Sequence, residues 1–159
     1  MSDTTTSSSL QSFLVEATKK QAEQLEAAMK RIPEDKRDWS PMGNARSAMD
    51  QYAECAILTG STAKLIKVRS WDSQGSMDDY FNQKNDLAKD YNGAKKLMAE
   101  NLPKIAEAIE SVQDKDLDVK VDMPWGPMAL KDIISYPYWN MSYHEGQINY
   151  IASMLGTLE

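Results

Sequence analysis

The sequence predicts an all-α protein, a four-helix bundle, and three observations support this class. Apolar residues recur at spacings of three and four over long stretches, the pattern of a helix with one apolar face. The 7 glycines and 6 prolines lie mostly between these stretches, where they fit connections. A chain of 159 residues is long enough for one domain with its own core. Long helices with short connections favour a bundle.

The first helix is expected to begin at Leu10 and to end near Arg31 or Ile32. Its inward face is built from residues at helical spacing: Leu10, Leu14, Ala17, Gln21, Leu25, Ala28 and Ile32. Pro33 ends the helix, because a residue that precedes proline disfavours the α conformation. Residues 1–8 are mostly small and polar, so we expect a flexible tail there and a single domain over 9–159.

The second helix is expected to follow a loop, beginning at Asn44 as N-cap and ending near Leu58, with Gly60 as C-cap. Glu54 is the only charged residue in the second half of this helix. The helix therefore has more apolar surface than a monomeric bundle needs. We expect a homodimer that uses this surface.

The third helical stretch is expected to begin at Ser76, which is an N-cap residue type. Apolar residues keep helical spacing from Met77 to Val112, as one helix or as two. Gly93 and Pro103 are the weak points at which this stretch would divide.

The last helix is expected to begin near Met128 and to run to about Leu155, with a kink at Pro137. It follows a short piece, residues 119–123, in which apolar and charged residues alternate as in a strand. The segment 124–127, Pro-Trp-Gly-Pro, is a turn by composition.

Charge and composition exclude several classes of function. The net charge is −6, which argues against a nucleic-acid or anionic-membrane surface, because phosphate binding depends on Lys and Arg. With one Cys and one His, the chain cannot supply a Cys/His zinc cluster or an internal disulfide. No stretch approaches the roughly 20 apolar residues of a membrane helix. We expect a cytoplasmic protein with Cys55 as a buried, unreactive thiol.

A polar seam coincides with the inward face of the last helix. Asn140, His144, Gln147 and Ile151 follow one another at spacings of four, three and four. Buried amides and imidazoles without partners cost about 1–3 kcal/mol each, so these side chains need partners in the core.

Glu54 is the expected partner of this seam, because a lone carboxylate among apolar neighbours needs a donor, a cation or a metal. We hypothesise that Glu54, Asn140 and His144 converge between the second and last helices, with Gln147, Tyr143 or Trp125 nearby. The alternatives are a purely structural histidine, and a glutamate that faces solvent or a dimer partner.

Three segments make the sequence similar to the DinB-like (YfiT-type) superfamily of four-helix bundles. They are "RIPEDKRDWSPM" at 31–42, "VDMPWGPMALKDII" at 121–134 and "NMSYHEGQINYI" at 140–151. The last of these resembles the family signature His-x-x-x-His-x-Gly-Gln. The resemblance covers the chain from about Leu10 to Leu155.

The resemblance implies a divalent metal site with a changed set of ligands. Metal-binding members of the superfamily use three histidines, one on the second helix and two on the last. At the matching positions this chain has Glu54, Asn140 and His144. A mixed site for Zn²⁺, Ni²⁺ or Mn²⁺ is one alternative. The other is a metal-free network in which Asn140 bridges Glu54 and His144.

Three functions follow as alternatives. The resemblance implies a metal-dependent hydrolase, or a thiol-dependent transferase or isomerase, with His144 and Glu54 as the catalytic candidates. The second alternative is a non-catalytic or stress-related bundle that binds a small ligand. Its pocket would be lined by aromatic and polar residues, among them Trp39, Trp125, Tyr138, Trp139, Tyr143 and Gln147. The third is self-association as a homodimer, which is compatible with either of the others.

Overall fold

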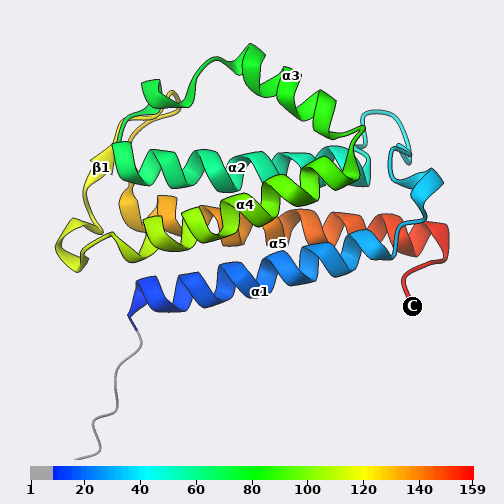
Figure 1. Ribbon diagram of the computed structural model, residues 1–159, viewed down its shortest axis with the longest axis horizontal. Coiled ribbons are helices and arrows are strands. Elements are labelled where there is room, and N and C mark those ends of the chain that lie inside the picture. Colours follow the sequence, from blue (N-terminus) through cyan, green and yellow to red (C-terminus); the bar gives the residue numbers. More distant parts are fainter. Residues whose placement is uncertain (1–8) are drawn as a thin grey trace, which may run out of the picture.

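The computed structural model describes residues 9–159, and it is mostly helical, as expected. The flexible tail expected for residues 1–8 lies outside the described residues. The α-helices, shown in Figure 1, are α1 (Leu10–Lys30), α2 (Ala48–Val68), α3 (Met77–Leu87), α4 (Tyr91–Glu110) and α5 (Leu130–Leu155). Three short 3₁₀ turns lie in the connections, at Glu34–Lys36, Trp71–Gln74 and Asp114–Asp116.

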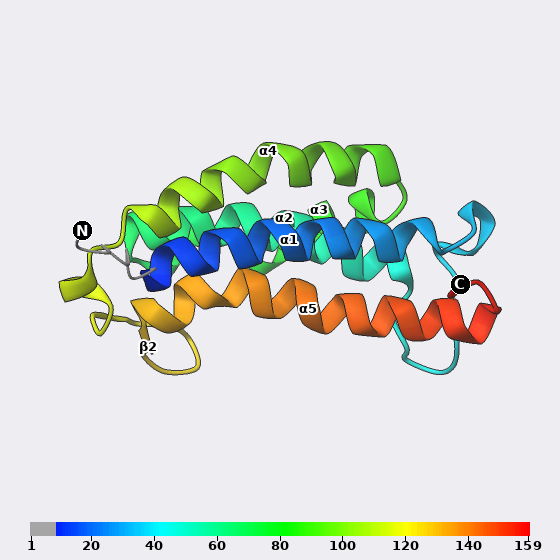
Figure 2. The same ribbon diagram turned by 90° about the horizontal axis from the view of Figure 1, so that it is seen from below.

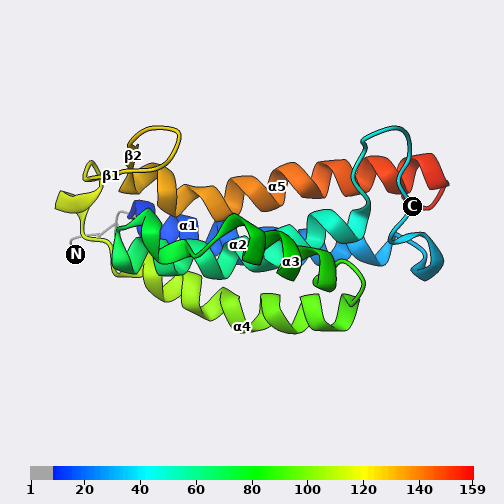
Figure 3. The same ribbon diagram turned by 90° about the horizontal axis from the view of Figure 1, so that it is seen from above.

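The four long helices pack side by side and enclose two clusters of buried hydrophobic residues. α1 packs on α4 and α5, and α2 also packs on both of them. Colours in Figures 1 and 2 show that α1 and α5 run in one direction and α2 and α4 in the other. The shorter α3 lies outside this group, over α2 (Figure 3), and returns the chain from the end of α2 to the start of α4. None of the described helices is long and apolar enough to cross a membrane.

The first and last helices begin and end close to the expected residues. α1 begins after Ser9, whose hydroxyl accepts a hydrogen bond from the Ser12 backbone N–H. α5 continues through Pro137 and ends at a left-handed Gly156. Before α5, the two-residue strands β1 (Lys120–Val121) and β2 (Met128–Ala129) pair antiparallel around the predicted turn.

The bounds predicted for the second helix were wrong at both ends. α2 begins later, because the hydroxyl of Ser47 rather than Asn44 caps it, by accepting from the Asp50 N–H. It continues past Gly60 for eight residues and ends at the left-handed Arg69. Gly60 lies inside the helix, where a missing side chain makes room for Asn101 of α4.

The third helical stretch forms two helices, and neither predicted weak point is where they divide. The break falls at residues 88–90, because the Asp90 carboxylate caps α4 by accepting from the Gly93 N–H. Pro103 is accommodated inside α4. Ser76 caps α3 as expected, accepting from the Asp79 N–H.

We predict that Gly60→Ala destabilises the protein. A Cβ at this position would lie 2.5 Å from the Asn101 side-chain nitrogen, which is buried and donates to the Ala56 carbonyl. Overpacking of this kind costs about 1–3 kcal/mol, which outweighs the helix propensity gained from alanine, about 1 kcal/mol. Urea denaturation should show the loss. Gly146→Ala is the control: no heavy atom lies within 4 Å of its Cβ position, so this variant should be unchanged or more stable. Equal gains at both positions would contradict the packing account.

Candidate functional site

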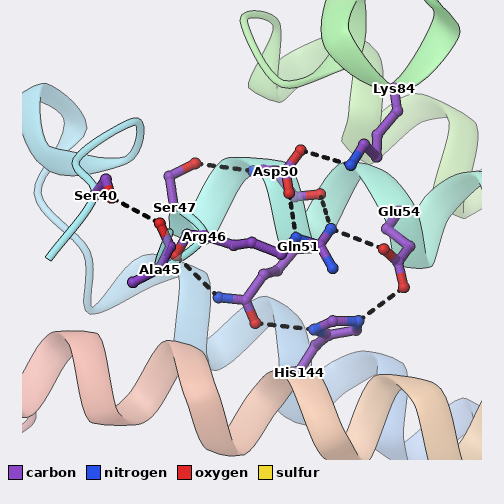
Figure 4. A network of polar contacts seen from close by, with 9 residues as sticks. All are labelled: Ser40, Ala45, Arg46, Ser47, Asp50, Gln51, Glu54, Lys84 and His144. Atoms are coloured by element: carbon purple, nitrogen blue, oxygen red, sulfur yellow. Dashed lines mark hydrogen bonds and ion pairs between the residues drawn. The ribbon is translucent and has the colours of Figure 1, made fainter. Parts of the chain in front are cut away.

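The imidazole of His144 points from α5 into the core and contacts α2. Its Nε2 lies 2.9 Å from Glu54 Oε1, and its Nδ1 lies 2.9 Å from Gln51 Oε1 (Figure 4). Only 3% of the residue is exposed. Both neighbours are oxygen acceptors, so the site accommodates a ring that carries a proton on each nitrogen. The structure thus brings together two of the three residues expected to converge, and it adds Gln51.

A chain of ion pairs continues from Glu54 along α2. Arg46 Nη2 lies 2.7 Å from Glu54 Oε2, and Arg46 also pairs with Asp50. Lys84 of α3 lies 3.0 Å from Asp50 (Figure 4). The network therefore joins α5, the start of α2 and α3, and within it each oxygen of Glu54 has a basic partner.

This network keeps Glu54 ionised. Burial alone would raise the pKa of its carboxyl group, but the hydrogen bond from His144 and the charge of Arg46 outweigh burial and lower the pKa to about 2. A carboxylate with so low a pKa is a poor general base near neutral pH, where bases with a pKa near the working pH are most effective. The geometry favours a binding or structural role for this pair over proton transfer.

Asn140 and Gln147 do not join the pair. Asn140 is buried, but its amide nitrogen donates to the Cys55 thiol at 3.7 Å, and among residues 9–159 no hydrogen bond links it to Glu54 or His144. The expected bridge is therefore wrong. Gln147 is exposed, because its position on the helix lies at the edge of the inward face. Cys55 is free and fully buried, and burial raises the pKa of its thiol, as expected for an unreactive cysteine.

A cavity of about 580 Å³ opens beside Glu54, between α2, the segment that carries α3, and the first turns of α5. Its walls are mainly aliphatic, aromatic and methionine side chains. Trp125 lines it, as predicted, but Trp39, Tyr143 and Gln147 do not. Trp39 packs against the core instead.

The predicted pocket residues on α5 face outward. Tyr143 is 52% exposed and Trp139 is 56% exposed, and neither lines the cavity. The aromatic residues that do line the cavity with Trp125 are Trp71, Tyr80 and Tyr136. Trp71 comes from the connection that follows α2, and Tyr80 comes from α3. Helical periodicity gives no information about where such a segment folds back, so the sequence offered no signal for them.

The residues at the implied metal position do not fit a divalent ion. His144 Nε2 and Glu54 Oε1 are already hydrogen-bonded to each other at 2.9 Å, and the Asn140 amide nitrogen, which is a donor, is engaged with Cys55. A neutral amide is in any case a weak ligand for Zn²⁺ or Ni²⁺. Within the described part of the chain, no three His, Cys, Asp or Glu side chains are grouped as metal ligands. We therefore assign no metal-dependent step to this site.

Comparisons with known proteins leave the family open. No family model matches the chain, and no curated protein matches it. The resemblance to the DinB-like superfamily stays a prediction.

Proposed function

We propose that this protein is a DinB-like four-helix bundle that binds a small, mostly apolar molecule in the cavity beside Glu54, without catalysing a reaction. The contact of His144 with Glu54 of α2 supports the family proposal, because the resemblance implies a site shared by the second helix and this part of the last helix. The cytoplasmic location inferred from the sequence stays a prediction.

The cavity is the observation that carries this proposal. Its volume of about 580 Å³ lies within the range of small-molecule sites, which are typically about 300–1,000 Å³, mostly apolar and equipped with few polar groups. Glu54 supplies a fixed polar group at its edge. The low pKa of Glu54 favours binding over acid–base catalysis.

Binding of an uncharged fluorescent probe tests the proposal. N-phenylnaphthylamine should bind with a stoichiometry near one per chain, and its emission should rise as it leaves water. Ser61→Phe should abolish this rise, because Ser61 lines the cavity and a phenyl ring would fill it. Ser111→Phe is the matched control. Ser61 and Ser111 both donate to the carbonyl three residues earlier, but Ser111 lies at the end of α4, outside the cavity.

Two results would contradict the proposal. Failure of the wild-type protein to bind the probe would remove the evidence for a ligand site. Equal binding by Ser61→Phe and wild type would place the probe elsewhere on the surface. A circular dichroism spectrum of each variant shows whether the helices are intact.

We propose that the homodimer forms through α5 rather than through α2. The apolar surface of α2 that suggested a dimer is used by the core and the cavity. On α5, from 138 to 154, the exposed side chains are all uncharged, in a chain of net charge −6. They are Tyr138, Trp139, Tyr143, Gly146, Gln147, Tyr150, Ser153 and Met154. Two copies can meet on this face without like-charge repulsion, and its aromatic and methionine residues are typical of interface cores.

Light scattering should therefore give a mass of two chains, and Tyr150→Lys should give a mass near 17.9 kDa. Tyr150 is 68% exposed, so the lysine costs little in the monomer but would be buried in the dimer. Phe13→Lys is the control, because Phe13 is similarly exposed, at 57%, but lies on α1. A wild-type monomer would contradict the dimer, and loss of the dimer only in Phe13→Lys would place the interface on α1.

A further inference from the structure

As far as the structure describes the chain, the walls of the cavity carry negative charge and aromatic rings but no positive charge. Glu54 and Asp79 are the two acidic residues that line it. The aromatic residues are Trp71, Tyr80, Trp125 and Tyr136, and among residues 9–159 no Lys, Arg or His belongs to the lining. This combination is selective, because aromatic ring faces and carboxylates attract organic cations and repel anions.

The basic residues that contact the Glu54 carboxylate do not line the cavity. Arg46 and His144 contact its two oxygens, yet neither lines the cavity, so a ligand meets the carboxylate before it meets either residue. The positive charges of Arg46 and Lys84 are also partly balanced by Asp50, which forms an ion pair with each of them. Each oxygen of Glu54 has one partner within this network, and a carboxylate offers about four acceptor positions. The side chain is 15% exposed, so it can accept a further hydrogen bond from a ligand.

Two tyrosines, Tyr80 and Tyr136, line the cavity together with Glu54 and lie close enough for its charge to act on them. Burial, followed by the charge of Glu54, raises the pKa of Tyr136 to about 12, and the same causes raise the pKa of Tyr80. Both phenols are therefore neutral near neutral pH and add polarisable ring faces rather than charge. At the other wall, Trp71 and Trp125 meet edge to face with ring centroids 5.0 Å apart. Trp125 is 65% exposed, which places it at the rim of the cavity.

On the basis of the proposed function, we infer that the ligand is an organic ammonium: a hydrophobic, preferably aromatic body that carries a protonated amine. The ammonium group donates to the free acceptor positions of Glu54 and lies against the rings of Tyr80 and Tyr136. The hydrophobic body fills the aliphatic and methionine-lined part of the cavity and reaches the two tryptophans. A carboxylic acid of the same size would face Glu54 and Asp79 without a basic side chain in the lining.

A matched series of three probes tests this inference by isothermal titration calorimetry. Naphthylethylamine, naphthylethanol and naphthylacetic acid share one aromatic body and differ in the charge of the head group. We expect the amine to bind wild type at least about tenfold more tightly than the alcohol, because hydrogen bonds to charged groups and cation–π contacts add to the shared burial. The acid should bind most weakly.

Two variants assign the preference to Glu54. Glu54→Gln should reduce the advantage of the amine over the alcohol to less than about threefold. Glu16→Gln makes the same chemical change on α1, at a residue whose side chain is 80% exposed, and should leave the advantage intact. If Glu54→Gln does not fold, the ranking of the three probes on wild type decides the question.

The outcomes separate the two proposals. If the alcohol binds as tightly as the amine, or the acid binds best, the ammonium inference is wrong while the cavity remains a ligand site. If none of the three probes binds, and N-phenylnaphthylamine fails as well, both proposals fall. An amine preference that persists in Glu54→Gln would also overturn the role given to this carboxylate.

Discussion

His144→Ala is expected to lower the free energy of unfolding by about 2–4 kcal/mol. The imidazole is almost fully buried and makes two hydrogen bonds, to Gln51 and Glu54. Its removal leaves the Gln51 carbonyl without a partner and leaves a void between α5 and α2. The loss also weakens the link between these helices, because the hydrogen bond with His144 ties Glu54 to α5. Urea denaturation followed by circular dichroism measures the effect.

Gln24→Ala provides the control for this prediction. Gln24 is exposed on α1, away from the network and from the dimer face proposed on α5, so its replacement should change stability by no more than about 0.5 kcal/mol. A loss below about 1 kcal/mol in His144→Ala would show that the imidazole contributes little to the packing of α5 on α2. The account of the network would then be wrong, although the helical fold would stand.

The second large effect is expected in acid. There the wild type should lose the stabilisation that the ionised Glu54 carboxylate provides, whereas Glu54→Gln has no such stabilisation to lose. The pKa of Glu54 falls from an ordinary value of 4.5 to about 2 in the folded protein. The folded state therefore prefers the ionised group. The resulting stabilisation is complete above the unfolded pKa and is lost as the pH falls through the folded value.

Between pH 7 and about pH 3, the stability advantage of wild type over Glu54→Gln should shrink by about 1–2 kcal/mol, after allowance for solvent at the partly exposed carboxylate. Urea denaturation of both proteins at the two pH values measures this change. Other acidic groups with lowered pKa values, Glu26 and Asp50, are present in both proteins, so the comparison removes most of their effect. A constant difference across this range would contradict the ion pairs assigned to Glu54.

Helical periodicity predicted the architecture because it reports directly which face of a helix is buried. It gave the class, the course of α1 and α5 and the short strand before α5. It also placed His144 and Glu54 on facing sides of two helices, since a polar residue within an apolar stripe must find a partner in the core. The contact of 2.9 Å between them agrees with that reasoning.

The errors arose where local sequence signals compete with tertiary contacts. Gly60 resembles a C-cap, but α2 continues because the glycine packs against Asn101 of α4, a contact invisible in the sequence. Arg46 was missed because it precedes α2, and its role depends on the turn that brings it back over Glu54. The cavity was misplaced for a related reason: two of its four aromatic residues, Trp71 and Trp125, come from connections rather than from the apolar face of a helix.

The central claim is that the Nε2–H of His144 donates a hydrogen bond to Glu54 instead of Nε2 coordinating a metal. The chain has a single histidine, so a proton–nitrogen correlation spectrum of the imidazole contains one unambiguous set of signals. We predict a proton on Nε2 that exchanges slowly with water, and a spectrum that stays unchanged when Zn²⁺, Ni²⁺ or Mn²⁺ is added. An Nε2 without a proton, or one that loses its proton on titration with one equivalent of metal, would contradict the claim.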